Sequence, residues 1–159
     1  MKRFLTYSLL TLTIFITSSY AGSVKKYKCL IQMTNYVGEG AYIVISLINP
    51  KGEYEKTLYV QGDDKEWYYE ITSWWKFYGK RRTNLDGRTG STISGGERSM
   101  KILEIEPSKI NKGYQIRVES AVESENYFER DIQFKLTTAN LQKKHNGSGF
   151  IQYLRIIPN

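Results

Sequence analysis

The chain alternates apolar and polar residues in several short segments separated by turn residues. The first three such segments are residues 27–33, 42–48 and 54–60. A period of two is typical of strands that bury one face, so we expect three consecutive antiparallel strands. The turn Asn49-Pro-Lys-Gly52 joins the second and third segments, and a hairpin is expected there because proline presets φ and glycine relieves the end of the turn.

The period changes after the third segment, where apolar residues recur every three or four positions. They are Trp67, Ile71, Trp74 and Tyr78. This spacing places them on one face of a helix and predicts a short amphipathic helix over residues 65–78. Asp63 or Asp64 is expected to cap its N-terminus, and Gly79 is expected to end it.

Alternation resumes in the second half of the chain, at residues 100–105, 114–118, 128–136 and 150–156. About seven short strands with Gly, Asn and Pro turns predict an all-β fold, an immunoglobulin-like antiparallel β-sandwich with one helical insertion. The chain has 159 residues, which suits one domain. We expect residues 22–159 to form it.

The N-terminal residues 1–21 have the charged, apolar and small-residue order of a secretory signal peptide. The alternative is a retained membrane anchor, which the short apolar run of about 13 residues disfavours. Cleavage before Gly22 would yield a secreted, periplasmic protein with no transmembrane segment. Cys29 is the single cysteine, so an intramolecular disulfide is excluded, and we expect this side chain to be buried.

Charge and composition disfavour some kinds of ligand site but do not identify one. The net charge of +7 favours phosphates, nucleic acid or anionic membranes without separating them. His145 is the single histidine and is expected in a solvated loop, so histidine metal sites and Ser-His-Asp triads have little support, and no catalytic or metal site is predicted. Strand carboxylates such as Glu119 and Glu123 are expected to face water.

One segment, residues 84–96, combines an acid, hydroxyls and glycines, and it is expected to lie outside any strand. Within it Asp86, Thr89, Gly90 and Thr92 have the spacing D-x-x-T-G-x-T. This pattern resembles the flavinylation motif D-x-x-[ST]-G-A-[ST] of covalent FMN-binding domains in bacterial respiratory complexes. In that family a Mg²⁺-dependent FMN transferase uses FAD to attach FMN to the last residue as a phosphoester.

The resemblance implies a role for each residue of the motif. Thr92 would be the covalent acceptor, acting as a nucleophile on the FAD pyrophosphate. Gly90 would let the backbone approach the phosphate, while Asp86 and Thr89 would hold the loop by hydrogen bonds. The family usually has Ala where this chain has Ser91, which makes Ser91 a rival acceptor. The alternative is a mobile Gly/Ser/Thr-rich loop without chemistry.

The residues before and within the motif could support such a site. Five of them are basic: Lys76, Lys80, Arg81, Arg82 and Arg88. They favour an anionic phosphate nearby, and Arg82 and Arg88 are candidate ligands. Trp75, with Tyr68 and Phe77, lies off the predicted core-facing side of the helix and is a candidate for stacking on a flavin ring, whereas the aromatic residues on that side are expected in the core.

A second resemblance extends over more of the chain. The segments at residues 41–58, 74–75, 86–92 and 112–119 are similar to those of predicted periplasmic proteins of the 2271 domain-of-unknown-function family. Members typically carry D-A-V-T-G-A-T at the motif, and their genes often lie near those of FMN transferases and PepSY-type membrane proteins. The family has no established activity to transfer.

Two functions follow as hypotheses. The first is an extracytoplasmic electron carrier with FMN on Thr92, loaded by an FMN transferase and paired with a PepSY-type or other membrane redox protein, rather than a stand-alone enzyme. The second is a cofactor-free binding module for a periplasmic or envelope protein or glycan. Nucleic acid is not expected as a partner, because the predicted compartment does not fit.

Overall fold

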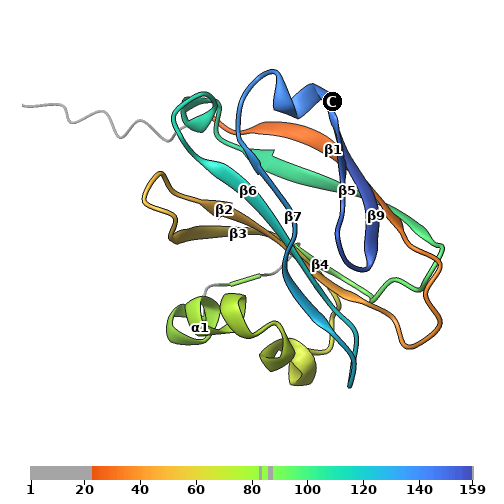
Figure 1. The fold of residues 1–159 in the computed structure, drawn as a ribbon. Helices are drawn as coiled ribbons and strands as arrows, with labels where there is room; N and C mark the ends of the chain where they lie inside the picture. The colour runs from red at the N-terminus through yellow and green to blue at the C-terminus, as the bar shows by residue number, and fades with distance from the viewer. Residues whose placement is uncertain (1–22, 83, 86–87, 159) are drawn as a thin grey trace, which may run out of the picture.

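The structure is a computed structural model that describes residues 23–82, 84–85 and 88–158. The predicted signal peptide and the candidate residue Asp86 lie outside the described residues. Two sheets stack face to face, one with strand order β5-β1-β9-β8 and the other with order β4-β3-β2-β6-β7 (Figure 1). The predicted all-β sandwich is therefore confirmed.

The four-stranded sheet consists of β1 (Lys25–Met33), β5 (Arg98–Ile105), β9 (Ile151–Pro158) and β8 (Lys144–Asn146). The five-stranded sheet consists of β2 (Tyr42–Ile48), β3 (Tyr54–Gln61), β4 (Thr89–Gly90), β6 (Gln115–Ala121) and β7 (Tyr127–Lys135). All pairs are antiparallel except β3 with β4. The seven expected strands are present, and the described residues add the short strands β4 and β8.

The expected hairpin between β2 and β3 is confirmed. Its turn is closed by the Gly52 amide, which donates to the Asn49 carbonyl over 2.9 Å, and Gly52 has a positive φ of 86°. The expectation that β1 pairs next to β2 is wrong, because β1 lies in the other sheet between β5 and β9. Alternation shows that a segment is a strand with one buried face, but it does not identify the neighbouring strand.

The main core lies between the two sheets, where the inward-facing side chains of both meet. β1 contributes Tyr27, Cys29, Ile31 and Met33 at alternate positions. The expected burial of Cys29 is confirmed, since none of its surface is exposed, and this burial raises the pKa of its thiol to about 12.

The helical insertion has two parts rather than one. A 3₁₀ helix, η1 (Lys65–Glu70), precedes α1 (Thr72–Arg81), and the buried Ile71 between them has a non-helical ψ of 68°. Asp64 is the N-cap as expected, since its carboxylate accepts from the Glu66 amide over 3.0 Å. The expected end at Gly79 is wrong, because the helix continues to Arg81 and ends where Arg82 adopts a left-handed conformation.

The insertion covers the outer face of the five-stranded sheet, below the sheet in Figure 1. A second buried cluster forms there from Tyr42, Val44, Val60, Tyr68, Ile71, Trp74, Leu85 and Ala121. Trp74 is fully buried, and its indole N–H donates to the Thr57 hydroxyl over 2.9 Å. β2 is therefore buried on both faces along its whole length, which explains its unbroken apolar sequence. Two single-turn 3₁₀ helices, η2 (Pro107–Lys109) and η3 (Asn140–Gln142), complete the described secondary structure.

Candidate functional site

The motif segment is attached to the edge of the five-stranded sheet. Thr89 and Gly90 form β4, which pairs in parallel with Val60 and Gln61 of β3. The Val60 amide donates to the Arg88 carbonyl over 2.8 Å. The expectation that this segment lies outside any strand is therefore wrong for Thr89 and Gly90. A strand of two residues is too short to leave an alternation in the sequence.

Gly90 packs closely against its neighbours, and a larger residue would have to displace them. A Cβ at this position would lie 2.5 Å from the Tyr59 hydroxyl and 3.3 Å from the Lys101 ammonium. Lys101 belongs to β5 in the opposite sheet, and its ammonium lies 5.6 Å from the centroid of the Tyr59 ring. Lys101 is therefore a cation beside the motif, and sequence reasoning did not identify it. One signal was available in the sequence. Lys101 lies two residues before the buried Leu103, so the two side chains share one face of β5.

Gln61 holds the segment that follows Gly90. It is buried, and its side-chain amide donates to the Ser91 carbonyl while its oxygen accepts from the Ser99 hydroxyl over 3.2 Å. Ser91 is exposed. Thr92 is half-buried, with its side chain against Gly40. The two candidate acceptors thus lie on a backbone that is fixed to both sheets.

A cavity of about 440 Å³ lies between the helical insertion and the chain just before the motif. The described residues that line it are Lys65, Tyr68, Trp75, Tyr78, Arg82, Asn84 and Leu85. Trp75 and Arg82, both predicted as cofactor ligands, therefore meet in one cavity. The rings of Trp75 and Tyr78 lie 5.9 Å apart at 44°. The volume is within the roughly 300 to 1,000 Å³ that small-molecule sites occupy.

Two other aromatic candidates have a mainly structural role. Tyr68 borders the cavity but is fully buried, and its ring packs edge-on against Trp74. Phe77 stacks on Tyr54 at 5.4 Å and is not among the described residues that line the cavity. The expectation that Tyr68 lies off the core-facing side is wrong, because the break at Ile71 changes which side of the insertion faces the sheet, whereas Tyr78 also lines the cavity.

Gly62 connects the cavity to the motif. Its amide donates to the Gly90 carbonyl, and its own carbonyl accepts from the Tyr68 hydroxyl over 2.9 Å. On the other side, the Arg88 amide donates to the carbonyl of Leu85, which also lines the cavity, over 2.8 Å. The motif and the aromatic cavity are therefore adjacent parts of one region, and Arg88 lies between them.

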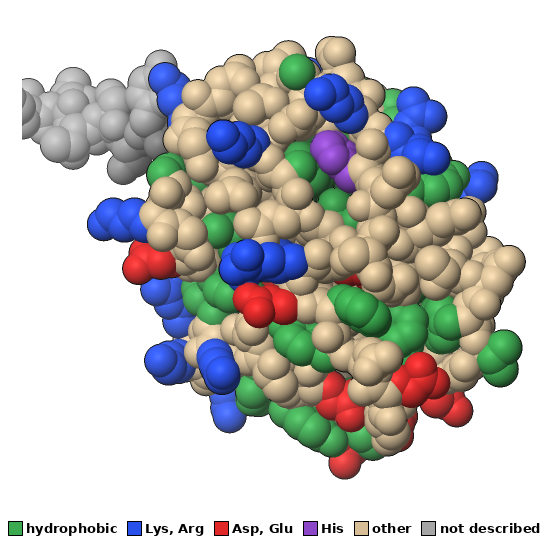
Figure 2. All heavy atoms as spheres, viewed as in Figure 1, with side chains coloured by type: hydrophobic (Ala, Val, Ile, Leu, Met, Phe, Trp, Pro, Cys, Tyr) green, Lys and Arg blue, Asp and Glu red, His purple; other side chains and the backbone are tan. Residues whose placement is uncertain are grey.

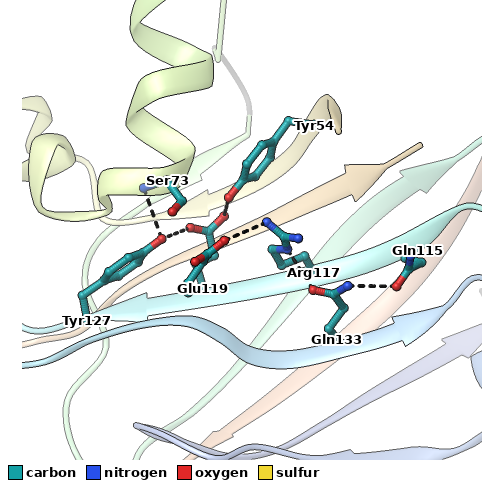
Figure 3. A network of polar contacts seen from close by, with 8 residues as sticks. Tyr54, Ser73, Gln115, Arg117, Glu119, Tyr127 and Gln133 are labelled. Carbon is teal, nitrogen blue, oxygen red and sulfur yellow. Dashed lines mark hydrogen bonds and ion pairs between the residues drawn. The ribbon is translucent and has the colours of Figure 1, made fainter. Parts of the chain in front are cut away.

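A separate polar network lies where α1 meets β6 and β7 (Figure 3). Glu119 is fully buried and accepts from the Tyr54 hydroxyl over 2.7 Å and from the Tyr127 hydroxyl over 2.5 Å. The Tyr127 oxygen in turn accepts from the Ser73 amide of α1 over 3.3 Å. Burial raises the pKa of Glu119 to about 7, although the two tyrosines and Arg117 favour its charged form. The expectation that Glu119 faces water is wrong, because the insertion covers this face.

The comparison with family models identifies the chain. Residues 24–153 match the family described as predicted periplasmic protein (DUF2271). The chain belongs to the DUF2271 family. This membership confirms the resemblance to that family and the periplasmic localisation predicted from residues 1–21. No curated protein and no solved structure matches the DUF2271 chain.

Two further features of this DUF2271 protein bear on its chemistry. His145 lies in β8, half-buried, with its ring stacked 3.7 Å from that of Phe134 and its Nε2 2.8 Å from the Asn140 carbonyl. The expectation of a solvated loop is therefore wrong. Within the described ranges, no cluster of three His, Cys, Asp or Glu side chains could hold a metal ion. The helices of those ranges include none long and apolar enough to cross a membrane.

Proposed function

We propose that this DUF2271 protein is an extracytoplasmic electron carrier that bears FMN covalently on Thr92. The observation that carries the proposal is the position of the D-x-x-T-G-x-T segment. Its T-G-x-T part follows directly on an aromatic and basic cavity, to which Gly62 joins it by two hydrogen bonds. An FMN attached to this segment through a phosphoester would have a cavity for its flavin ring in the same region.

The residues around Gly90 fit a phosphate. The Tyr59 hydroxyl fills the place that a Cβ at Gly90 would take, so a phosphate beside this residue would meet that hydroxyl as a hydrogen-bond donor. The ammonium of Lys101 lies on this side, and Arg88 precedes the strand. Cations close to a bound phosphate stabilise its negative charge. Ser91 is exposed, whereas the Thr92 hydroxyl lies against Gly40, so attachment at Thr92 would require this oxygen to turn toward the transferase.

Attachment requires a partner enzyme of known chemistry. The Thr92 hydroxyl oxygen would form a bond to the flavin-side phosphorus of FAD, the pyrophosphate P–O bond would break, and AMP would leave as the hydroxyl loses its proton. Mg²⁺ in the FMN transferase would neutralise the charge on the leaving group. The family resemblance adds a PepSY-type or other membrane redox protein as the electron partner.

The cavity would hold and tune the ring. FMN supplies reversible uptake of electrons and protons, and this chain's residues would set where that happens and at what potential. Trp75 and Tyr78 offer faces for stacking. Lys65 and Arg82 at the cavity would favour the reduced, more negative form of the ring.

The test is the mass of the mature protein exported with and without an active FMN transferase. Addition of one FMN less one water, mapped to Thr92, is the expected result. Thr92→Ala should abolish the adduct, Thr92→Ser should retain it, and Ser91→Ala is the matched control that should leave it unchanged. Surface substitutions of this kind typically change stability by under ~0.5 kcal/mol, so loss of folding would not explain the result.

An unmodified mass, with the transferase active on another substrate, would refute the proposal and leave the cofactor-free binding module. An adduct mapped to Ser91 would support the electron-carrier function and identify Ser91, rather than Thr92, as the acceptor.

A further inference from the structure

The outer face of the four-stranded sheet has no covering layer among the described elements. Side chains at alternate positions of β1, β5 and β9 point away from the core and are exposed or half-exposed. This contrasts with the five-stranded sheet, whose outer face lies under the helical insertion. We call this uncovered surface the outer β1 face.

Apolar side chains are exposed on the outer β1 face, two of them on the edge strand β5. Met100, Ile102 and Ile157 are 57%, 45% and 40% exposed, and they are three of the six large apolar side chains that stand out from the described surface. The register sets Lys28 of β1 between Ile102 and Ile157, and Leu30 between Met100 and Arg155. Leu30, Met100 and Ile102 are therefore neighbours, and with Ile157 beyond Lys28 they form an apolar strip on three strands, which is an unusual arrangement for a surface that meets only water.

Basic side chains surround the strip. They are Lys26, Lys28, Arg98, Lys144 and Arg155. The acidic residue at the edge of this face is Glu104, and it lies 4.0 Å from the Lys26 ammonium. Figure 2 shows Lys and Arg side chains along the top of the molecule and also down its left side, while the visible acidic side chains lie below the top. The outer β1 face is thus strongly positive.

This charge selects among possible occupants. A second copy of the chain would bring two positive faces together, and like charges in contact are unfavourable. Protein interfaces are depleted in lysine, whereas three of these five cations are lysines. Lysine and arginine around exposed aliphatic side chains are typical of proteins that lie on anionic lipid, where the cations meet the headgroups and the apolar groups enter the interface.

We propose that the outer β1 face binds the surface of an anionic phospholipid membrane. Attraction to the headgroups would come from the five cations, and the strip formed by Leu30, Met100, Ile102 and Ile157 would contact the boundary between headgroups and acyl chains. Binding is expected to be weak, reversible and sensitive to salt, because no lipid anchor or inserted helix takes part. The proposal does not depend on a flavin.

The test uses the mature protein without FMN and vesicles of phosphatidylcholine, either alone or mixed with phosphatidylglycerol. The protein should sediment with the mixed vesicles at low salt and be released at high salt. A variant with Lys28→Glu and Arg155→Glu should bind more than tenfold less, because each cation near an anionic surface contributes about fivefold. Lys51→Glu with Lys112→Glu is the matched control, since both residues are exposed, lie away from this face and change the net charge equally.

The result that supports the proposal is a large loss in the first variant with most binding kept in the control. Equal loss in both variants would overturn it, because binding would then follow net charge alone. No sedimentation with either vesicle would also overturn it and leave an acidic protein as the occupant. Met100→Ser with Ile102→Ser is a second variant that keeps every charge, and reduced binding there would support insertion of the apolar strip.

Discussion

Glu119 makes the stability of this protein depend on pH near neutrality. Its carboxylate is fully buried under α1, and burial raises its pKa from 4.5 to about 7. A folded-state pKa above the unfolded value means that the folded state binds more protons between these two values. The free energy of unfolding should therefore be highest below pH 4.5 for this group, fall as pH rises through 7, and level off above it.

The magnitude follows from the size of the pKa shift. One pKa unit corresponds to about 1.36 kcal/mol, so the shift of Glu119 amounts to about 3 kcal/mol when it is fully expressed. Between pH 5 and pH 8 the contribution is about 2 to 3 kcal/mol, because part of the loss has already occurred at pH 5. This is a large fraction of the roughly 5 to 15 kcal/mol that stabilises a typical domain.

Urea unfolding of the wild type and of Glu119→Gln over this pH range measures the effect. Glutamine keeps the shape and accepts from one of the two tyrosines but does not ionise. We expect the wild type to lose about 2 to 3 kcal/mol more than the variant between pH 5 and pH 8. Glu129→Gln is the matched control, because Glu129 pairs with Arg117 over 3.2 Å in the same network yet is 43% exposed. Parallel pH profiles for wild type and Glu119→Gln would refute the reasoning.

Two further predictions concern packing. Gly90→Ala should destabilise the fold by about 1 to 3 kcal/mol, because its Cβ would overlap the Tyr59 hydroxyl. Gly79→Ala should be neutral or stabilising, since this residue is in a helix and its Cβ would meet the Trp75 ring at an ordinary 3.5 Å. Thermal unfolding compares the two, and equal midpoints would contradict the packing argument. Cys29 should resist thiol reagents at pH 8 in the folded protein and react on addition of urea, because burial raises the pKa of its thiol and blocks access.

Local pattern was enough to predict most of the fold. The seven longer strands, the β2–β3 hairpin and the Asp64 cap all follow from the order of apolar, polar and turn residues within a few positions. The pairing of β1 with β5 and β9 could not be predicted in this way, since it joins segments about 70 and 120 residues apart. The break at Ile71 follows from fitting Tyr68 and Trp74 into one core, which is a tertiary effect.

The candidate site was predicted only where its residues are close in the sequence. Trp75 and Arg82 meet in the cavity because one helix and its cap carry both. Lys101 and Gln61 reach the motif from other strands, and the alternation of Lys101 with Leu103 indicates which side of β5 it faces but not that the motif lies there. Glu119 alternates like a solvent-facing residue, and only the insertion, which comes from a distant segment, makes its position buried.

The two proposed surfaces lie on opposite sides of the sandwich, and this constrains how the protein would meet its partners. The cavity adjoins the insertion on the outer side of the five-stranded sheet, and the outer β1 face belongs to the other sheet. A protein resting on the membrane through that face would turn its cavity toward the periplasm. Its redox partner would then need a domain that extends above the membrane surface. Charge reversal at Lys28 and Arg155 should slow electron transfer to a membrane-embedded partner, and it should not change flavin attachment at Thr92.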